Sequence, residues 1–203
     1  MLPATPSLVV KRNPLMPRQP VPLEKAYRLI NHGPTVMISA QHGGITNVMS
    51  ASWLCALDYA PARVTVVIDK ENYTRHLIEQ SGWFGVQIPF AAQAETVITM
   101  GESRKDNPDK LRAVSLFTPE GYDVPLVADS AAWLICRVLP EPHNQETYDL
   151  FIGEVAAAWA DDRVFRNGHW HFDDVGDDLK TLHYIAGGQF YRTGCGLKTD
   201  GGP

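Results

Sequence analysis

Short apolar runs separated by turn-forming residues dominate the chain, and most of these runs have the composition of strands. Residues 64–68 (Val-Thr-Val-Val-Ile) are mainly β-branched and follow Pro61, which is typical of a buried strand. Asn167-Gly168 between two short apolar segments is the strongest hairpin signal in the chain. Further strands are predicted over residues 35–40, 46–55, 84–88, 131–139 and 148–159 and, interrupted by Gly187-Gly188, over 184–191.

Helical periodicity is confined to short segments. One helix is predicted to begin near Asn72 or Tyr73 and to end at Gly82, and a second covers residues 94–98. Asn107-Pro108 is an N-cap followed by a favoured first helical residue, and Pro22 opens another short helix with Leu23, Tyr27 and Ile30 on one face. About seven to nine strands with three or four short helices favour a closed or nearly closed β-barrel with helical inserts.

The organisation along the chain is simple. Six prolines in the first twenty-two residues predict an extended N-terminal arm over residues 1–20. Residues 21–203 then form a single domain without internal repeats or low-complexity segments, and 203 residues are enough to bury a large core.

Composition excludes several classes of protein. Hydrophobic residues make up 44% and charged residues 20%, as in ordinary globular chains. The net charge of −5 disfavours nucleic acid as a partner, because phosphate neutralisation needs clustered Lys and Arg. No apolar run is long enough to span a membrane and no secretion signal precedes the domain, so we expect no membrane association and a cytoplasmic location.

Metal and nucleophile signals are weak. The three cysteines are far apart and form no CxxC pair, which disfavours zinc and disulfides, and we expect Cys55 to be a buried small apolar residue. His169 and His171 share a strand face but lack a third ligand, so we expect them to be ordinary hairpin residues. No metal site is predicted.

Two segments carry candidate chemistry. In residues 44–53, strand alternation places Ser50 and Ser52 on one face, where small hydroxyl residues would let a flat ligand lie against the backbone. A solvent-facing polar strand explains this pattern better from composition alone. Residues 69–75 end a strand and start a helix, so free amides, Thr74 and the charge of Lys70 or Arg75 would suit a phosphate. Ordinary helix capping by Asn72 explains this second pattern equally well.

An ordered set of short motifs resembles the flavin reductase-like family of FMN-binding split barrels, in particular its flavoredoxin branch. The motifs span residues 20–195 and are Pro34-Thr35-Val36-Met37-Ile38-Ser39, Asn47-Val48-Met49-Ser50-Ala51-Ser52-Trp53, Thr74 with Leu77-Ile78, Gly82-Trp83-Phe84-Gly85-Val86, Asp109-Lys110-Leu111, Phe151-Ile152-Gly153-Glu154-Val155, and Leu182-His183-Tyr184 through Gly187-Gly188-Gln189-Phe190-Tyr191.

The resemblance implies a mainly β fold, an FMN-binding split β-barrel with a few short helices, that forms a homodimer with FMN near the interface. It implies three groups of cofactor-binding residues. The isoalloxazine and ribityl parts would be held by Asn47, Val48, Met49, Ser50, Ala51, Ser52 and Trp53. The ribityl-phosphate end would lie against Asp69, Lys70, Tyr73 and Thr74, and His183 and Tyr184 would close the site.

The function implied is that of an FMN-dependent oxidoreductase in which NADH or NADPH transfers a hydride to flavin N5, with Ser50 and Ser52 as hydrogen-bond donors near the ring. Two departures from the family pattern are Gln87, where Asn is usual, and Tyr148, where many members have a histidine near the reactive face. Tyr148 favours an alternative, a flavoredoxin-type carrier that passes electrons to a protein partner without efficient NAD(P)H turnover. A third reading keeps the barrel without flavin, since related split barrels bind haem or nothing.

Overall fold

The computed structural model describes residues 34–197 and 199. The predicted arm over residues 1–20 and the predicted helix after Pro22 lie outside the described residues. Within them, the predicted mainly β fold with a few short helices is confirmed. No helix among the described residues is both long enough and apolar enough to cross a membrane.

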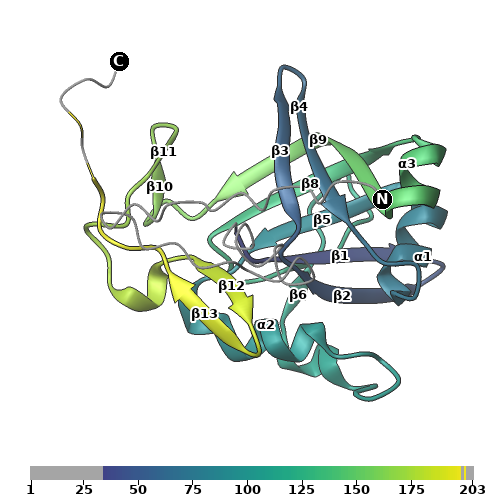
Figure 1. Cartoon of the computed structure of the whole chain (residues 1–203), viewed down its shortest axis with the longest axis horizontal. Helices are drawn as coiled ribbons and strands as arrows, with labels where there is room; N and C mark the ends of the chain where they lie inside the picture. Colours follow the sequence, from purple (N-terminus) through teal and green to yellow (C-terminus); the bar gives the residue numbers. More distant parts are fainter. Residues whose placement is uncertain (1–33, 198, 200–203) are drawn as a thin grey trace, which may run out of the picture.

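A seven-stranded antiparallel sheet forms the centre of the described part of the chain (Figure 1). Its strand order is β2-β1-β5-β8-β9-β4-β3. The strands are β1 (Val36–His42), β2 (Ile45–Ala51), β3 (Leu54–Tyr59), β4 (Ala62–Val67), β5 (Trp83–Ile88), β8 (Ala132–Leu139) and β9 (Leu150–Ala160).

Smaller elements cover the faces and ends of this sheet. The helices are α1 (Tyr73–Ser81), α2 (Ala94–Gly101) and α3 (Pro142–Tyr148), with single 3-10 turns η2 (Ala91–Gln93), η3 (Lys110–Ala113) and η4 (Asp177–Leu179). Three two-stranded pairs complete the described fold: β6 (Leu116–Phe117) with β7 (Leu126–Val127), β10 (Phe165–Arg166) with β11 (His169–Trp170), and β12 (Leu182–Ala186) with β13 (Gln189–Arg192).

The sheet separates two packed layers because neighbouring residues of β1 point to opposite sides. Ile38 belongs to the larger core cluster, which contains Ile78 of α1 and the buried rings of Phe84 and Phe151. Met37 belongs to a second cluster with α2 and β12, whose members are Met37, Val48, Val97, Met100, Val127 and Leu182. Strand β2 therefore contacts α1 on one side and α2 on the other, which sets up the site described below.

Several local predictions are confirmed. Asn72 caps α1 with its side chain, and Gly82 ends the helix at φ 72°, a conformation that suits glycine. The Asn167-Gly168 turn has φ values of 51° and 78° and joins β10 to β11, as the two-residue hairpin signal predicts.

Other local predictions are wrong. The strand predicted over residues 148–159 begins only at Leu150, because Tyr148 ends α3 and Asp149 turns the backbone at φ 56°. Residues 184–191 form a hairpin rather than one strand, since Gly187 and Gly188 supply its turn. The strand predicted over residues 46–55 is likewise interrupted between β2 and β3.

The helix predicted after Asn107-Pro108 is a single 3-10 turn, η3, that follows Asp109. The Asn107 side chain donates to Glu102 Oε2 at 2.6 Å and is not the N-cap of that turn. Cys55 is exposed on the sheet-edge strand β3, so its predicted burial is also wrong.

Candidate functional site

Two adjoining cavities form one cleft between β2 and the segment that begins with α2. The smaller, of about 370 Å³, is called the apolar half, and the larger, of about 770 Å³, the charged half. Both are lined by Ser50, Gly101 and Glu102, so they meet at the end of α2. Each volume lies within the usual range of small-molecule sites.

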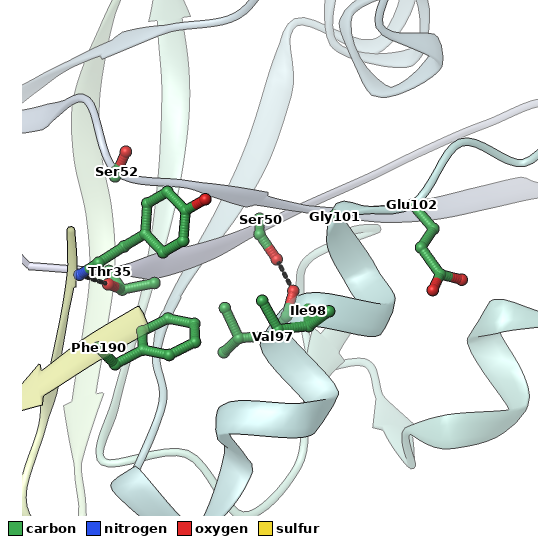
Figure 2. Close-up of a pocket in the computed structure, with 9 residues that line it drawn as sticks. Thr35, Ser50, Ser52, Val97, Ile98, Gly101, Glu102 and Phe190 are labelled. Atoms are coloured by element: carbon green, nitrogen blue, oxygen red, sulfur yellow. Dashed lines mark hydrogen bonds between the residues drawn. The ribbon is translucent and has the colours of Figure 1, made fainter. Parts of the chain in front are cut away.

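The apolar half is bounded by side chains from β2, α2 and the β12–β13 hairpin. It is lined by Thr35, Ser50, Ser52, Val97, Ile98, Gly101, Glu102, Tyr184 and Phe190. Figure 2 shows Thr35, Val97 and Phe190 gathered beside Ser50. The Phe190 ring lies 5.3 Å from the ring of Tyr184, and the Tyr184 N–H donates to Thr35 Oγ1 at 2.7 Å. The two aromatic rings therefore form one apolar side of this cavity, and the hydrogen bond to Thr35 fixes the backbone of Tyr184.

The two serines that the alternation placed on one face do line this same cavity, but they differ chemically. The Ser50 hydroxyl donates its hydrogen to the Val97 carbonyl (Figure 2), so toward a ligand it can only accept. Ser52, just beyond the end of β2, lines the cavity without such a bond among the described residues. Ser52 is therefore the hydroxyl donor of the pair.

The charged half lies at the start of α1. Its lining residues are Asn47, Met49, Ser50, Asp69, Glu71, Asn72, Tyr73, His76, Met100, Gly101, Glu102, Ser103, Arg104, Lys105 and Lys110. The Thr74 N–H donates to Asn72 Oδ1 at 2.9 Å, and the Arg75 N–H donates to the Asn72 carbonyl at 3.1 Å. Because capping already satisfies these helix amides, positive charge in this half must come mainly from side chains.

Asn47 connects β2 to α1 beneath the charged half. It is 2% exposed, and its Nδ2 donates to Oγ1 of the fully buried Thr74 at 2.9 Å. The Asn47 Oδ1 atom has no hydrogen-bond partner among the described residues. A buried carbonyl without a partner is costly, so this acceptor favours a polar ligand or water in the cleft.

Cationic groups enter the charged half from the segment after α2. The Arg104 guanidinium lies 5.5 Å from the centre of the Tyr73 ring and donates to the Thr46 carbonyl. Lys110 is 3% exposed, and its Nζ donates to the carbonyls of Met100 and Glu102 at 2.8 and 2.7 Å. Burial, reinforced by the nearby Arg104, lowers the pKa of Lys110 to about 8 despite the attraction of Glu102.

The structure brings together most of the residues predicted for the site. Those that line the cleft are Asn47, Met49, Ser50, Ser52, Asp69, Tyr73 and Tyr184, with Thr74 directly beneath Asn47. Five others do not line it. Val48 and Ala51 pack against the two core clusters, Trp53 is half exposed, and His183 is paired with Tyr191 across the β12–β13 hairpin.

The fifth is Lys70, whose Nζ lies 2.5 Å from the Glu146 carbonyl and 3.7 Å from Asp149 Oδ1, outside both cavities. Arg75, the other cation considered for a phosphate, is also committed elsewhere, to Glu79 and Asp149. The cations that do line the cleft were not predicted as site residues, although Lys110 belongs to one of the motifs that carry the resemblance. A signal existed in the polar stretch 101–105 between two helical segments, but only the fold brings that stretch to β2.

Tyr148 also lies outside both cavities. It is 59% exposed at the end of α3, where its ring meets the edge of His143 at 5.7 Å. Gln87 is buried in β5 and donates to Ser39. Among the described residues, no group of three His, Cys, Asp or Glu side chains could hold a metal ion.

The cleft fits FMN, the group implied by the motifs. A flat ring system suits the apolar half with its aromatic wall and serine hydroxyls. A phosphate suits the charged half, which holds Arg104, Lys105 and Lys110. The buried Asn47 Oδ1 supplies an unused acceptor between β2 and α1.

Comparison with known proteins finds a matching family and a similar crystal structure. The model of the family "Flavin reductase like domain" matches residues 27–188. A crystal structure described as an FMN-binding domain of a flavin reductases-like enzyme from Shewanella baltica OS155 is 54% identical, with a TM-score of 0.81 over 89% of this chain and 96% of that chain. The predicted split-barrel fold is thereby confirmed.

Two curated relatives extend the comparison. The YddH protein of Escherichia coli K12 is 40% identical over 180 residues, which is 86% of this chain and 94% of that protein. A ferric-chelate reductase (NAD(P)H) of Archaeoglobus fulgidus is 25% identical over 160 residues, or 77% of this chain and 94% of that protein.

Proposed function

Because the chain belongs to the flavin reductase-like domain family, we propose that it is an FMN-dependent oxidoreductase that accepts a hydride from NADH or NADPH. The observation that carries the proposal is the continuous cleft, with an apolar half for a flat ring and a cationic half for a phosphate. The name of the Archaeoglobus relative, a ferric-chelate reductase (NAD(P)H), supports the choice of donor.

FMN supplies a ring that accepts and releases hydride or single electrons, and the protein sets its orientation and access. In this proposal, Val97, Tyr184 and Phe190 would exclude water from one side of the ring. Ser52 would serve as a hydrogen-bond donor to the ring and Ser50 as an acceptor, because the Ser50 hydroxyl already donates to the Val97 carbonyl. Asn47 Oδ1 would accept from the ribityl part, and Arg104 with its cationic neighbours would neutralise the phosphate.

The donor is tested by mixing FMN-loaded protein anaerobically with NADH or NADPH and following the visible absorbance of the flavin. Rapid loss of absorbance with at least one donor supports the proposal. Unchanged absorbance with both, while FMN stays bound stoichiometrically, would instead identify an electron carrier of the flavoredoxin type. A protein that gains no thermal stability from saturating FMN would refute flavin binding, because about a hundredfold excess over the Kd adds about 2.7 kcal/mol.

The phosphate position is tested by comparing FMN with riboflavin, which lacks the phosphate. Arg104→Ala should weaken FMN about tenfold or more and leave riboflavin unchanged, since it removes a charged hydrogen-bond donor. Lys70→Ala should leave the affinity for FMN unchanged. The motif resemblance places Lys70 at the phosphate, but its ammonium lies at the Glu146 carbonyl. Selective loss of FMN affinity in Lys70→Ala alone would move the phosphate to that side of α1.

We also propose a homodimer. Strand β3 is the edge of the sheet and nearly all of it is exposed, including Leu57 (51%) and Tyr59 (92%). A second copy would cover these apolar side chains, which are otherwise an unprotected strand edge. Light scattering tests the assembly, and Leu57→Lys with Tyr59→Lys should shift it to monomer. A wild-type monomer at micromolar concentration would refute it.

A further inference from the structure

A separate cavity lies at the other end of α1 from the charged half of the cleft. Its volume is about 440 Å³, within the usual range of small-molecule sites. It lies between the β1–β2 turn, the last turn of α1, the start of β5 and the loop before β7, and its lining residues are Gln41, His42, Gly43, Gln80, Ser81, Trp83, Gly121, Tyr122 and Asp123. None of these residues lines either half of the cleft, so this cavity is a distinct place on the molecule.

Two aromatic rings supply the apolar surface of this cavity. The ring centres of Trp83 and Tyr122 lie 6.1 Å apart, and the ring planes make an angle of 64°. Both side chains pack against the buried cluster that contains Leu126, so the protein core holds them in place. Aromatic ring faces carry negative potential and attract organic cations, which makes such a pair of rings suitable for a positively charged ligand.

Asp123 adds a carboxylate with one oxygen unused. Its Oδ1 accepts from Gln41 Nε2 at 2.7 Å, and Gln41 Oε1 accepts from the Thr46 hydroxyl at 2.6 Å. Because the Thr46 hydroxyl fixes which end of the Gln41 amide faces Asp123, the carboxylate is held in one orientation. The Asp123 Oδ2 atom has no hydrogen bond or ion pair with any described residue, and no Lys or Arg is among the residues that line the cavity.

The end of α1 adds negative potential to the same cavity. Gln80 and Ser81 belong to its last turn, where most carbonyls lack a partner within the helix. The helix dipole makes this end partly negative, and the last turn contains no basic residue that would offset it. Both the helix end and Asp123 would repel an anion, so the electrostatics of the cavity favour a cation.

We propose that this cavity binds a small organic cation, a primary ammonium carried on an apolar stem. The ammonium would donate to Asp123 Oδ2 and to carbonyls at the end of α1, and the stem would lie against Trp83 and Tyr122. A primary ammonium fits these acceptors because it has three N–H donors. The proposal goes beyond the proposed function, since it requires no flavin in the cleft.

Three probes with the same phenethyl body test the charge of the head group: phenethylamine, phenethyl alcohol and phenylpropionate. Alkyl amines are protonated at neutral pH, as lysine side chains are, so only the first probe is a cation. In calorimetric titration we expect the amine to bind with a Kd of about 1 mM or tighter. It should bind at least about tenfold more tightly than the alcohol or the carboxylate, because its hydrogen bonds are charged. Equal affinity for amine and alcohol, or no binding of the amine at about 10 mM, would overturn the proposal.

Asp123→Asn tests the carboxylate. The variant keeps an oxygen that can accept from Gln41 but loses the charge, so it should weaken the amine at least about tenfold and leave the alcohol unchanged. Asp173→Asn is the matched control, since Asp173 is also exposed and accepts one hydrogen bond, from the Gly196 N–H at 2.7 Å, away from the cavity. The control should bind the amine as the wild type does. An Asp123→Asn protein with wild-type affinity for the amine would refute the assignment.

A second variant places a competing cation in the cavity. Gln80 is exposed, and a lysine in the last turn of α1 interacts favourably with the helix dipole, so Gln80→Lys should fold. Its ammonium should occupy the position beside Asp123 and weaken the amine at least about tenfold. Saturating FMN should leave the affinity of the wild type for the amine unchanged, because the cavity and the cleft share no lining residue. An amine that FMN displaces, or that binds Gln80→Lys as tightly as the wild type, would contradict the proposed position.

Discussion

Arg75→Lys should destabilise the protein strongly although it preserves the charge. Arg75 lies within α1, and its side chain is only 6% exposed. Its guanidinium donates to the Ile68 carbonyl at 3.0 Å, the Gln145 carbonyl at 2.8 Å and Asp149 Oδ1 at 2.5 Å. This single planar group therefore joins α1 to the end of β4, to α3 and to the turn before β9.

The magnitude follows from what a lysine cannot replace. An ammonium can stay near Asp149, but it cannot span both carbonyls, because it lacks the planar fork of the guanidinium. Each lost bond from a charged donor costs about 1.5–3 kcal/mol. The Glu79 contact adds little because that carboxylate is 40% exposed. With one bond partly recovered, we expect a loss of about 3 kcal/mol in the free energy of unfolding.

Urea unfolding at fixed protein concentration measures this loss as a lower midpoint with an unchanged slope. Arg112→Lys is the matched control, since Arg112 is 82% exposed and reaches Asp109 only at 3.4 Å. The control should stay within about 0.5 kcal/mol of wild type. A loss below about 1 kcal/mol in Arg75→Lys would refute the reasoning that the fork, rather than its charge, holds α1 in place.

Three further outcomes are expected. Gly153→Ala should cost about 1–3 kcal/mol in thermal or urea unfolding, because the added Cβ would lie 2.9 Å from the Cys136 Cβ and closer to the Phe84 ring, whereas Gly194→Ala, with open space around it, should be neutral. The Cys136 thiol should resist a thiol reagent until the protein unfolds, since burial raises its pKa to about 12, while the exposed Cys195, which lies outside β3, reacts at once. Lys110 should make the stability of the ligand-free protein depend on pH, because its pKa is about 8 in the folded protein and 10.5 in the unfolded chain. Between these two values the unfolded chain binds more protons, so the free energy of unfolding should rise with pH by up to about 3 kcal/mol. Lys110→Met should abolish this gain.

The sequence correctly predicted those elements whose ends are determined by interactions between residues close together in the chain. Asn72 and Gly82 mark the two ends of α1 because a side-chain cap and a left-handed residue act within one turn. Asn167-Gly168 specified its hairpin for the same reason. Helix α3 escaped prediction because its residues carry little apolar periodicity and none of them is buried. Pro142 at its start was the one available signal.

The apolar half of the cleft was only partly predictable. Strand alternation placed Ser50 and Ser52 on one face, and both line the cavity. Alternation says nothing about hydrogen bonding, however, and the Ser50 hydroxyl is committed to the Val97 carbonyl of α2. That contact joins residues 47 positions apart, so it follows only from the way α2 packs on β2.

The charged half shows why proximity in sequence misled the choice of cation. Lys70 lies two residues before the Asn72 cap, which makes it the natural candidate for a phosphate at the start of α1. In the fold its ammonium turns to the Glu146 carbonyl and Asp149, whereas Arg104 and Lys110 reach the cleft from beyond α2. A phosphate at a helix start needs a cation that is close to it in space, and that cation need not be close in sequence. If Arg104→Ala and Lys110→Met selectively weaken FMN while Lys70→Ala does not, the packing of α2 on β2 determines phosphate recognition.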